Sequence, residues 1–336
     1  MFVELTTLAF RFHKKHSALH SGTIIKSTGS WYQVRLDESG EMIPCRIVGK
    51  FRTEGLRFTN PIAVGDKVGV LIAQSDEGIT GAIQKIEPRA NYVVRQSPRR
   101  KHDLHLLASN IDQAMLLATI VHPNLKQGFI DRFLLMTEPF SIPTTLVFNK
   151  ADLYGEEELA IFGGLKVIYE SIGYEVLLVS AHTGLGVAEV RSRLAGKTTL
   201  VSGQSGVGKS SLVNHVQPGL ELRTQELSDY SGKGQHTTTF AEMFTLPDGG
   251  FLIDTPGIKT LSFNYLEPTE VAHNFREFFE LSEDCRFGGS CLHRNEPGCA
   301  VKAALKAGTV SELRYANYLA LLEEIEDQNY WERREV

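Results

Sequence analysis

The stretch TTLVSGQSGVGKSS, residues 198 to 211, decides the fold of this chain of 336 residues. An apolar run leads into Gly203, the pattern G-x-x-x-x-G-K-S continues to Ser210, and helical spacing begins at Lys209. A strand, a glycine-rich loop and a helix in this order hold phosphate, because backbone N–H groups and the positive end of the helix converge on its oxygens. The stretch therefore predicts an α/β domain that binds a nucleotide.

The positions of this loop have distinct expected roles. Gly206 and Gly208 allow the backbone to approach the β-phosphate, whereas a chance glycine-rich turn would not supply every motif position in this context. Lys209 is expected to reach the β- and γ-phosphate oxygens during catalysis, and Ser210 to bind Mg²⁺. The residues expected around the phosphates are Gly203, Gln204, Ser205, Gly206, Val207, Gly208, Lys209, Ser210 and Ser211.

Apolar runs and helical segments alternate from Asn110 onward. This alternation indicates a mainly parallel sheet, which binds ligands at the carboxyl ends of its strands. The tetrapeptide DTPG, Asp254 to Gly257, follows one such run, GGFLI. By itself it is also a good turn, but beside a phosphate loop it predicts that Asp254 holds Mg²⁺ and that the Gly257 N–H meets the γ-phosphate.

The tetrapeptide NKAD, residues 149 to 152, precedes the phosphate loop and has the chemistry of a guanine reader. Guanine presents two adjacent donors, N1–H and the 2-amino group, which one carboxylate accepts together and which adenine lacks. Asp152 supplies that carboxylate. Asn149 is expected to bond N7 and brace neighbouring loops, and the aliphatic part of Lys150 to lie on the ring. Ala151 completes this loop.

A second base loop is expected at SAHTG, residues 180 to 184, where Ser180 opens a turn and the Ala181 N–H would meet the guanine O6. In isolation this would be an ordinary serine-led turn. All parts of a GTP/GDP site are then present, but the base loops come before the phosphate loop. A circular permutation explains that order, since chain termini are superficial and often close enough to be joined. The loop after Asp254 then leads directly into the C-terminal segment.

The polar segment LSDYSGKGQHTTTF, residues 227 to 240, is typical of a switch that orders around Mg²⁺ and the γ-phosphate. One of Thr237, Thr238 and Thr239 is expected to bind Mg²⁺ through its hydroxyl, and we favour Thr238. In Ras-like enzymes a glutamine after the DxxG loop orients the attacking water, but Ile258 stands there in this chain. We hypothesise that His236 orients the water once a partner fixes the switch, and that unaided hydrolysis is slow. The alternative is a solvent-facing histidine in a loop.

Three cysteines, Cys285, Cys291 and Cys299, form the pattern C-x5-C-x-H-x5-C with His293. Three thiolates and one imidazole make a closed tetrahedral site, which favours one structural Zn²⁺. Disulfides are rare in cytosolic proteins, which argues against that alternative. Cys45 lies apart in a strand-like run and is expected to be a buried apolar residue.

Short alternating runs broken by turn residues extend from residue 22 to 90 and predict a small OB-type β-barrel. Such barrels bind oligonucleotides, and GKFRTEGLRF, residues 49 to 58, mixes cations with phenylalanines as RNA contacts would. Core phenylalanines beside solvated charges are the alternative. Residues 1 to 108 hold 16 Lys+Arg against 10 Asp+Glu, and the remainder holds 19 against 30. The N-terminal third is therefore the expected face for an anionic partner.

The composition, with 42% hydrophobic and 22% charged residues, is that of an ordinary globular protein. The longest apolar run, AMLLATIV at residues 114 to 121, is far shorter than the roughly 20 residues of a membrane span. The basic residues follow the apolar part of the N-terminus, which is the reverse of the order in a signal peptide. We therefore expect a cytoplasmic monomer with no membrane partner.

The predicted domain layout has five parts. They are an N-terminal extension (1–21), an OB-type RNA-binding barrel (22–90), a basic linker (91–109), a circularly permuted P-loop GTPase domain (110–268) and a zinc-binding module with a C-terminal helix (269–336). In the linker, Arg99, Arg100 and Lys101 are candidates for contact with an RNA backbone.

The barrel, the permuted site and the Cys3His module, in this order, resemble the bacterial family of small-ribosomal-subunit (30S)-dependent GTPases A. NKAD, GQSGVGKSS, GQHTTT, DTPGI and the cysteine cluster carry the resemblance, from about Gly22 to the C-terminal helix. It implies a GTPase that binds the small ribosomal subunit and its 16S rRNA late in maturation, hydrolyses GTP there and leaves in the GDP state. His236 and Ile258 occupy the positions of that family's altered catalytic arrangement. One departure is the spacing of five residues, where the family usually has four, between the first two cysteines.

Two other functions remain as alternatives. A metabolic P-loop kinase or ATPase would account for the phosphate loop but not for NKAD and SAHTG, and ATP would then displace GTP. An RNA-binding module with a structural nucleotide would show no turnover, even with ribosomal subunits present.

Overall fold

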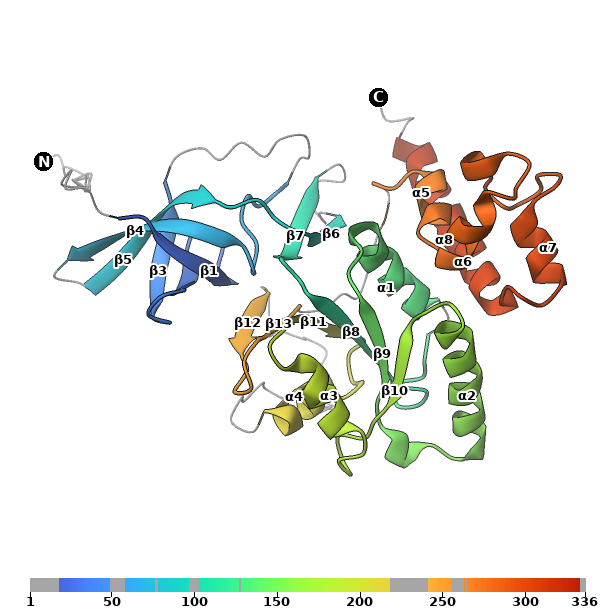
Figure 1. The fold of residues 1–336 in the computed structure, drawn as a ribbon, viewed down its shortest axis with the longest axis horizontal. Coiled ribbons are helices and arrows are strands. Elements are labelled where there is room, and N and C mark those ends of the chain that lie inside the picture. Colours follow the sequence, from blue (N-terminus) through green and yellow to red (C-terminus); the bar gives the residue numbers. More distant parts are fainter. Residues whose placement is uncertain are drawn as a thin grey trace, which may run out of the picture.

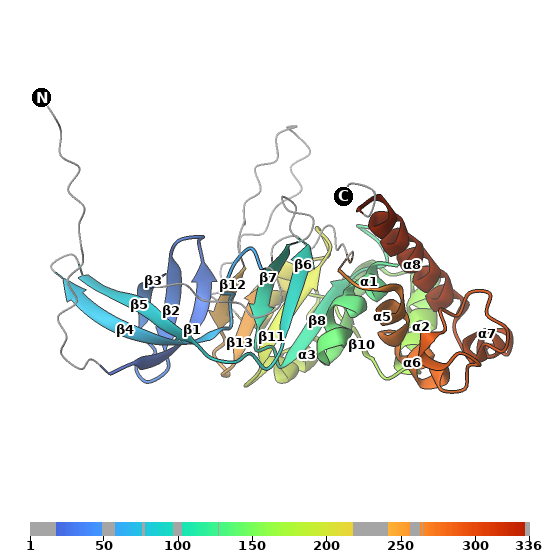
Figure 2. The ribbon, with the colours of Figure 1, turned by 90° about the horizontal axis from the view of Figure 1, so that it is seen from above.

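The computed structural model describes residues 18–48, 58–75, 78–96, 103–126, 128–217, 241–255, 263 and 265–332. A β-barrel lies at one end of the molecule, a module of helices at the other, and an α/β core between them (Figures 1 and 2). Within these residues, none of the helices has the length and apolar character that crossing a bilayer requires.

The barrel consists of five strands, β1 (His20–Ser27), β2 (Tyr32–Leu36), β3 (Met42–Ile47), β4 (Lys67–Ser75) and β5 (Gly78–Ile86). They pair in the order β1-β2-β3-β5-β4, and β4 pairs again with β1, which closes the barrel. Strands β3 and β5 run parallel, and the other pairs are antiparallel. Inward residues such as Ile24, Val34 and Ile43 fill the interior. The predicted OB-type barrel is confirmed.

A two-stranded hairpin, β6 (Tyr92–Gln96) and β7 (Leu104–Ser109), occupies most of the interval expected to be a linker. Its apolar positions are buried, and the Tyr92 ring meets the ring of Phe58 edge to face, with 6.0 Å between centroids. Phe58 is the one residue of the expected RNA segment 49–58 that the structure describes. The basic residues 99–101 lie outside the described residues.

A buried carboxylate fastens this hairpin to the barrel. Asp66, just before β4, accepts hydrogen bonds of 2.7 Å from both Nε and Nη2 of Arg89. It also accepts a 2.6 Å bond from the Ser109 hydroxyl and a 2.9 Å bond from the Ala63 N–H. The Asp66 side chain is fully buried, so these donors replace its lost hydration.

Within the part of the chain that the structure describes, the core sheet holds six strands, β8 (Gln113–Ala118), β9 (Thr144–Phe148), β10 (Glu175–Leu178), β11 (Thr198–Gly203), β12 (Glu242–Thr245) and β13 (Phe251–Asp254). Their order is β10-β9-β8-β11-β13-β12, with every neighbouring pair parallel except β13 and β12. All residues of β8 and β9 are buried, as expected where helices cover both faces of a sheet. The predicted mainly parallel sheet is confirmed.

Four helices and two 3-10 turns belong to this core: α1 (Phe129–Thr137), η1 (Glu138–Phe140), η2 (Ala151–Leu153), α2 (Glu156–Glu170), α3 (Val187–Leu194) and α4 (Lys209–Val216). Successive strand residues point to opposite faces, so Leu146 of β9 packs with α1 and α2, and Val147 packs with α3 and α4. The helices therefore form a layer on each face of the sheet.

Strand β12, at the edge of the core sheet, also meets the barrel. One antiparallel residue pair, Lys26 opposite Glu242, joins β12 to β1, and the two side chains form an ion pair of 2.9 Å. The barrel and the core sheet are therefore hydrogen-bonded to each other.

The C-terminal module holds α5 (Pro268–His273), α6 (Arg276–Ser282), η3 (Gly288–Ser290), α7 (Ala300–Lys306) and α8 (Glu312–Glu332). A buried guanidinium fastens it to the core: Arg314 of α8 donates to Asp131 of α1 at 2.5 Å and to Glu277 of α6 through two bonds of 2.8 Å. Asp131 also accepts from Asn317 at 2.5 Å and from the Tyr169 hydroxyl at 2.9 Å. Helices far apart in the sequence thus share one polar cluster.

Candidate nucleotide site and metal centre

The four nucleotide motifs follow four strands of the core sheet. NKAD comes after β9, SAHTG after β10, the phosphate loop after β11 and DTPG at the end of β13. These strands run parallel, so their carboxyl ends lie along one edge of the sheet. The topology thus brings together segments that the sequence separates widely.

Asn149 joins the base loops to the phosphate loop. Its side-chain Nδ2 donates to the Val207 carbonyl at 2.9 Å, and its Oδ1 accepts from the Ala181 N–H at 3.0 Å. The side chain is almost fully buried, with 1% of the residue exposed. A Cβ atom at Gly208 would lie 2.4 Å from Asn149 Nδ2, so only glycine permits this approach. The three loops are therefore in direct contact.

The other residues of NKAD are held by neighbouring loops. Asp152 is exposed and accepts a hydrogen bond from the Ser180 hydroxyl, and the Ala151 N–H donates to the Val179 carbonyl at 3.0 Å. Lys150 has a φ of 67°, and its Nζ donates to the His122 carbonyl. Burial lowers the pKa of Lys150. The carboxylate expected to read guanine thus faces solvent from a braced backbone.

The phosphate loop has the open backbone expected of an anion cradle. Gly206 and Gly208 have φ values of 84° and 87°, and α4 begins at Lys209. Of the loop's other residues, Ser205 and Ser211 are exposed, and Gln204 and Ser210 are half-buried. A Cβ atom at Gly203 would lie 2.5 Å from the Leu117 carbonyl oxygen, which explains glycine at the end of β11.

The phosphate loop also meets the metal-side loop. Lys209 Nζ lies 2.5 Å from Asp254 Oδ1, and less than a fifth of either side chain is exposed. The cation expected to bind phosphate and the carboxylate expected to hold Mg²⁺ therefore occupy the same end of the site. Gly257, Ile258, His236 and Thr238 lie outside the described residues, so their expected roles stay predictions.

One part of the site was missed by sequence reasoning, namely the loop that follows β8. Its His122 carbonyl holds Lys150, and Pro123 Cδ lies 3.5 Å from the position of a Cβ atom on Gly206. Tyr154, two residues after Asp152, hydrogen-bonds to the same loop through the Ile120 N–H. These residues belong to no sequence motif. The signal that could have identified them is their position directly after a buried parallel strand, where ligands bind.

The predicted zinc ligands form one buried cluster. The ligand atoms of Cys285, Cys291, His293 and Cys299 all lie within 4.8 Å of one another. His293 Nδ1 is 3.7 Å from Cys285 Sγ and 3.4 Å from Cys299 Sγ. Tetrahedral Zn²⁺ with Zn–S bonds of about 2.3 Å separates its ligand atoms by roughly 3.5–4 Å. The donor set and its spacing fit one such ion.

The surroundings of this cluster hold its shape. His293 has a φ of 55°, and the His293 and Leu292 carbonyls accept hydrogen bonds from the hydroxyls of Tyr315 at 2.6 Å and Tyr318 at 2.7 Å. Burial raises the pKa of Cys291 to about 12, so a metal ion that binds there must displace a proton. Helix α8, which carries both tyrosines, therefore holds the backbone at Leu292 and His293 in place.

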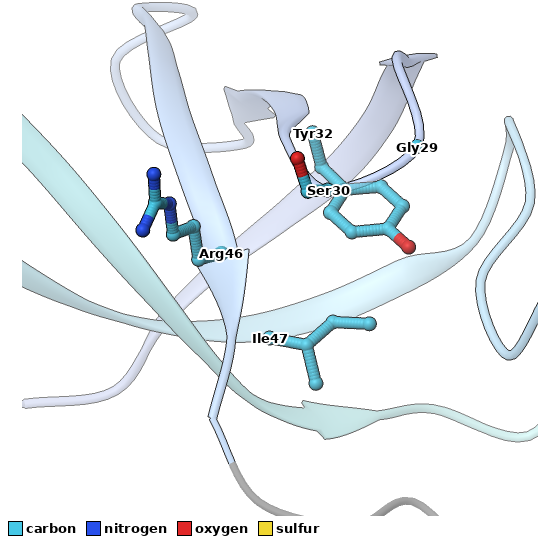
Figure 3. A pocket seen from close by; sticks show the side chains of 5 residues that line it. All are labelled: Gly29, Ser30, Tyr32, Arg46 and Ile47. Carbon is cyan, nitrogen blue, oxygen red and sulfur yellow. The ribbon is translucent and has the colours of Figure 1, made fainter.

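A hollow of about 380 Å³ lies on the barrel (Figure 3), and none of its lining residues belongs to a nucleotide motif. It is lined by Gly29, Ser30, Tyr32, Arg46 and Ile47. The Arg46 guanidinium stacks 3.9 Å from the centre of the Trp31 ring. This surface of the barrel therefore places a cation against an aromatic ring.

Comparison with known proteins identifies the family. The model of the RsgA GTPase matches residues 86–264, and the model of the RsgA N-terminal domain matches residues 21–80. The chain belongs to the RsgA GTPase family. Its GTPase activity is therefore as predicted, and the kinase or ATPase alternative is set aside. Use of GTP, GDP and Mg²⁺ goes with membership of this GTPase family.

Named relatives of this RsgA GTPase match over nearly their whole length. The chain is 48% identical to the small ribosomal subunit biogenesis GTPase RsgA of Bacteroides fragilis, covering 92% of this chain and 98% of the relative. It is 47% identical to that of Christiangramia forsetii, covering 92% and 97%.

Two solved structures share the fold of this RsgA GTPase. YjeQ from Thermotoga maritima has a TM-score of 0.73 and 35% identity, covering 91% of this chain and 98% of that one. YloQ, described as a circularly permuted GTPase, has a TM-score of 0.70 and 31% identity, covering 95% and 99%. The predicted circular permutation is confirmed.

Proposed function

We propose that this RsgA GTPase is a late maturation factor of the small ribosomal subunit, whose GTP or GDP state controls binding and release. The observation that carries the proposal is the Asn149 bridge, which joins the guanine loops to the phosphate loop. The relatives named as small ribosomal subunit biogenesis GTPases supply the partner.

In this proposal the two ends of the nucleotide are held by different loops. Asp152 accepts from the guanine N1–H and 2-amino group, and the Ala181 N–H, which donates to Asn149 Oδ1 in this structure, is then shared with O6. Lys209 leaves Asp254 and binds the β- and γ-phosphate oxygens instead. Asp254 is then free to bind Mg²⁺. The proposed protein ligands of Mg²⁺ are Ser210, Thr238 and Asp254. The Gly257 N–H donates a hydrogen bond to the γ-phosphate. His236 orients the attacking water when the subunit fixes the switch.

The barrel is the proposed contact for 16S rRNA. The Trp31–Arg46 stack beside the hollow of Figure 3 supports it, because a half-buried ring next to an exposed cation can bind an unpaired base and its phosphate. The positive balance of residues 1 to 108 supports the same assignment. The Cys285–Cys299 cluster would hold one structural Zn²⁺ and so fix the C-terminal module.

The test is GTP hydrolysis by the full chain, alone and with purified small or large ribosomal subunits. Slow turnover alone and strong stimulation by small subunits only are the expected results. Equal rates with and without small subunits would refute subunit control, and no turnover at all would favour a structural nucleotide. Sedimentation of the free protein tests the proposed monomer, and cell fractionation tests the proposed cytoplasmic location.

A further inference from the structure

Tyr154 occupies a position between the guanine loop and the loop that follows β8. It comes directly after η2, the turn that contains Asp152, and its side chain is half-buried against the core. Its hydroxyl accepts a hydrogen bond from the Ile120 N–H at 2.9 Å and donates one to the Asn149 carbonyl at 2.9 Å. The same hydroxyl lies 3.4 Å from Thr119 Oγ1, which is a longer contact to the segment after β8. The two short bonds use the phenol proton and one lone pair, so the hydroxyl bridges two backbones.

The two backbones joined by this bridge carry the residues that hold the guanine loop. Asn149 spans the phosphate loop and the SAHTG loop through its side chain, so a shift of its peptide moves both contacts. The loop after β8 also receives Lys150, whose Nζ donates to the His122 carbonyl. Tyr154 is thus the one side-chain hydroxyl among the described residues that fixes the main chain of NKAD against this loop.

We propose that Tyr154 is a positioning residue for guanine recognition, which rests on the proposed function of the site. It acts through the Asn149 carbonyl and does not touch the base. Asp152 gains its selectivity from accepting two donors at once, and such a paired contact tolerates little displacement. Loss of the bridge should therefore weaken the binding of guanine nucleotides more than that of hypoxanthine nucleotides, because the hypoxanthine ring lacks the 2-amino group.

The substitution Tyr154→Phe isolates the hydroxyl, because the ring that packs on the core is retained. The matched control is Tyr174→Phe, which removes a buried hydroxyl at the other end of β10, remote from the nucleotide loops. The full chain is titrated with GDP, with IDP and with ADP, and steady-state GTP turnover is measured in the presence of small subunits.

Tyr154→Phe is expected to weaken GDP binding about three- to tenfold, as for one lost hydrogen bond, and IDP binding about twofold or less. Its KM for GTP should rise while kcat stays near the wild-type value, since the base end is remote from the γ-phosphate. Tyr174→Phe should change neither the affinities for GDP and IDP nor the KM for GTP. An unchanged GDP-to-IDP ratio in Tyr154→Phe, or an equal change in the control, would overturn the proposal.

Combination with Asp152→Ala shows through which group Tyr154 acts. If Tyr154 positions Asp152, its effect on GDP affinity should shrink to within about twofold once the carboxylate is gone. A full, additive effect in that background would contradict the inference. Failure of the proposed function looks different, because GTP turnover by the wild-type protein would then be the same with and without small subunits, whatever Tyr154 does.

Discussion

At the scale of single residues, the nucleotide site depends on close approaches that particular side chains permit. Asn149 reaches the Val207 carbonyl only because Gly208 leaves room for its amide. Lys150 adopts a positive φ, which a side chain rarely adopts without support, and its Nζ is held by the His122 carbonyl. Loop geometry here is set by contacts between loops more than by each loop's own sequence.

Gly208→Ala is expected to weaken GDP binding at least tenfold. Its Cβ would lie 2.4 Å from Asn149 Nδ2 at a φ of 87°, so the amide must leave the phosphate loop or the backbone must shift, a strain of about 1–3 kcal/mol. The measurement is GDP titration together with thermal unfolding.

The control for this change is Gly164→Ala in α2, where a Cβ atom meets nothing within 4 Å. It should stabilise the protein by about 0.5–1 kcal/mol, because alanine is the better helix former, and leave GDP binding unchanged. Similar GDP losses in both variants would show that glycine substitution acts generally and not through Asn149.

At the scale of elements, the C-terminal module is held by a buried ion cluster and by the predicted metal site. Arg314 of α8 is fully buried between Asp131 of α1 and Glu277 of α6. Its guanidinium also lies 4.5 Å from the centre of the Phe275 ring. These contacts tie α8 to the core from one side, while Tyr315 and Tyr318 tie it to the cysteine turn from the other.

Arg314→Met is expected to destabilise the folded protein by about 3–5 kcal/mol, because it leaves two buried carboxylates without their cation. Chemical unfolding followed by helical circular dichroism measures the change. Arg191→Gln, at an exposed pair with Asp248, is the control and should alter stability little. Equal effects of the two changes would argue that burial at Arg314 contributes nothing.

Cys291→Ser is expected to abolish bound zinc and to loosen the module, because a closed tetrahedral site loses one of its four ligands. Zinc content by atomic spectroscopy and proteolysis of the C-terminal region are the readouts. Cys45→Ala, in the barrel core, should keep the wild-type zinc content. Wild-type protein purified without zinc, yet resistant to protease, would contradict the structural-metal assignment.

At the scale of the whole molecule, two of the polar contacts that attach the barrel differ in burial. Lys26 and Glu242 form an ion pair in which 40% and 30% of the side chains are exposed, at the single residue pair between β1 and β12. Asp66, by contrast, is fully buried and accepts two hydrogen bonds from Arg89 and one from Ser109 of β7, which join the barrel to the β6–β7 hairpin. The Asp66 contacts should therefore contribute more to the stability of the protein than the Lys26–Glu242 pair.

Asp66→Ala is accordingly expected to cost about 3–5 kcal/mol of stability, since it leaves the half-buried Arg89 guanidinium without its carboxylate and removes the acceptor of the Ser109 hydroxyl. Lys26→Ala should cost about 1 kcal/mol or less, as for other half-exposed pairs. Thermal unfolding and hydrogen exchange in β1 and β7 distinguish the two. A larger effect of Lys26→Ala would mean that the β1–β12 contact governs the placement of the barrel.

How far the sequence could predict this protein depends on how local each feature is. The phosphate loop, NKAD, SAHTG and DTPG are contiguous motifs that follow apolar strands, so the α/β core, the permutation and the site edge were predictable. The cysteine pattern predicted the cluster of four ligands for the same reason. The sequence predicts a linker where the hairpin β6–β7 lies, because the basic residues 99–101 obscure the alternation of residues such as Val93 and Leu106, which are buried.

The sequence by itself determined which chemical groups are present and which strands they follow, because local motifs and apolar periodicity are written along the chain. Only the tertiary structure decided that Tyr154 bridges Ile120 and Asn149, that Arg314 meets Asp131 across 183 positions, and that β12 pairs with β1. Such partners are chosen by packing in three dimensions, where separation along the chain carries no information about distance.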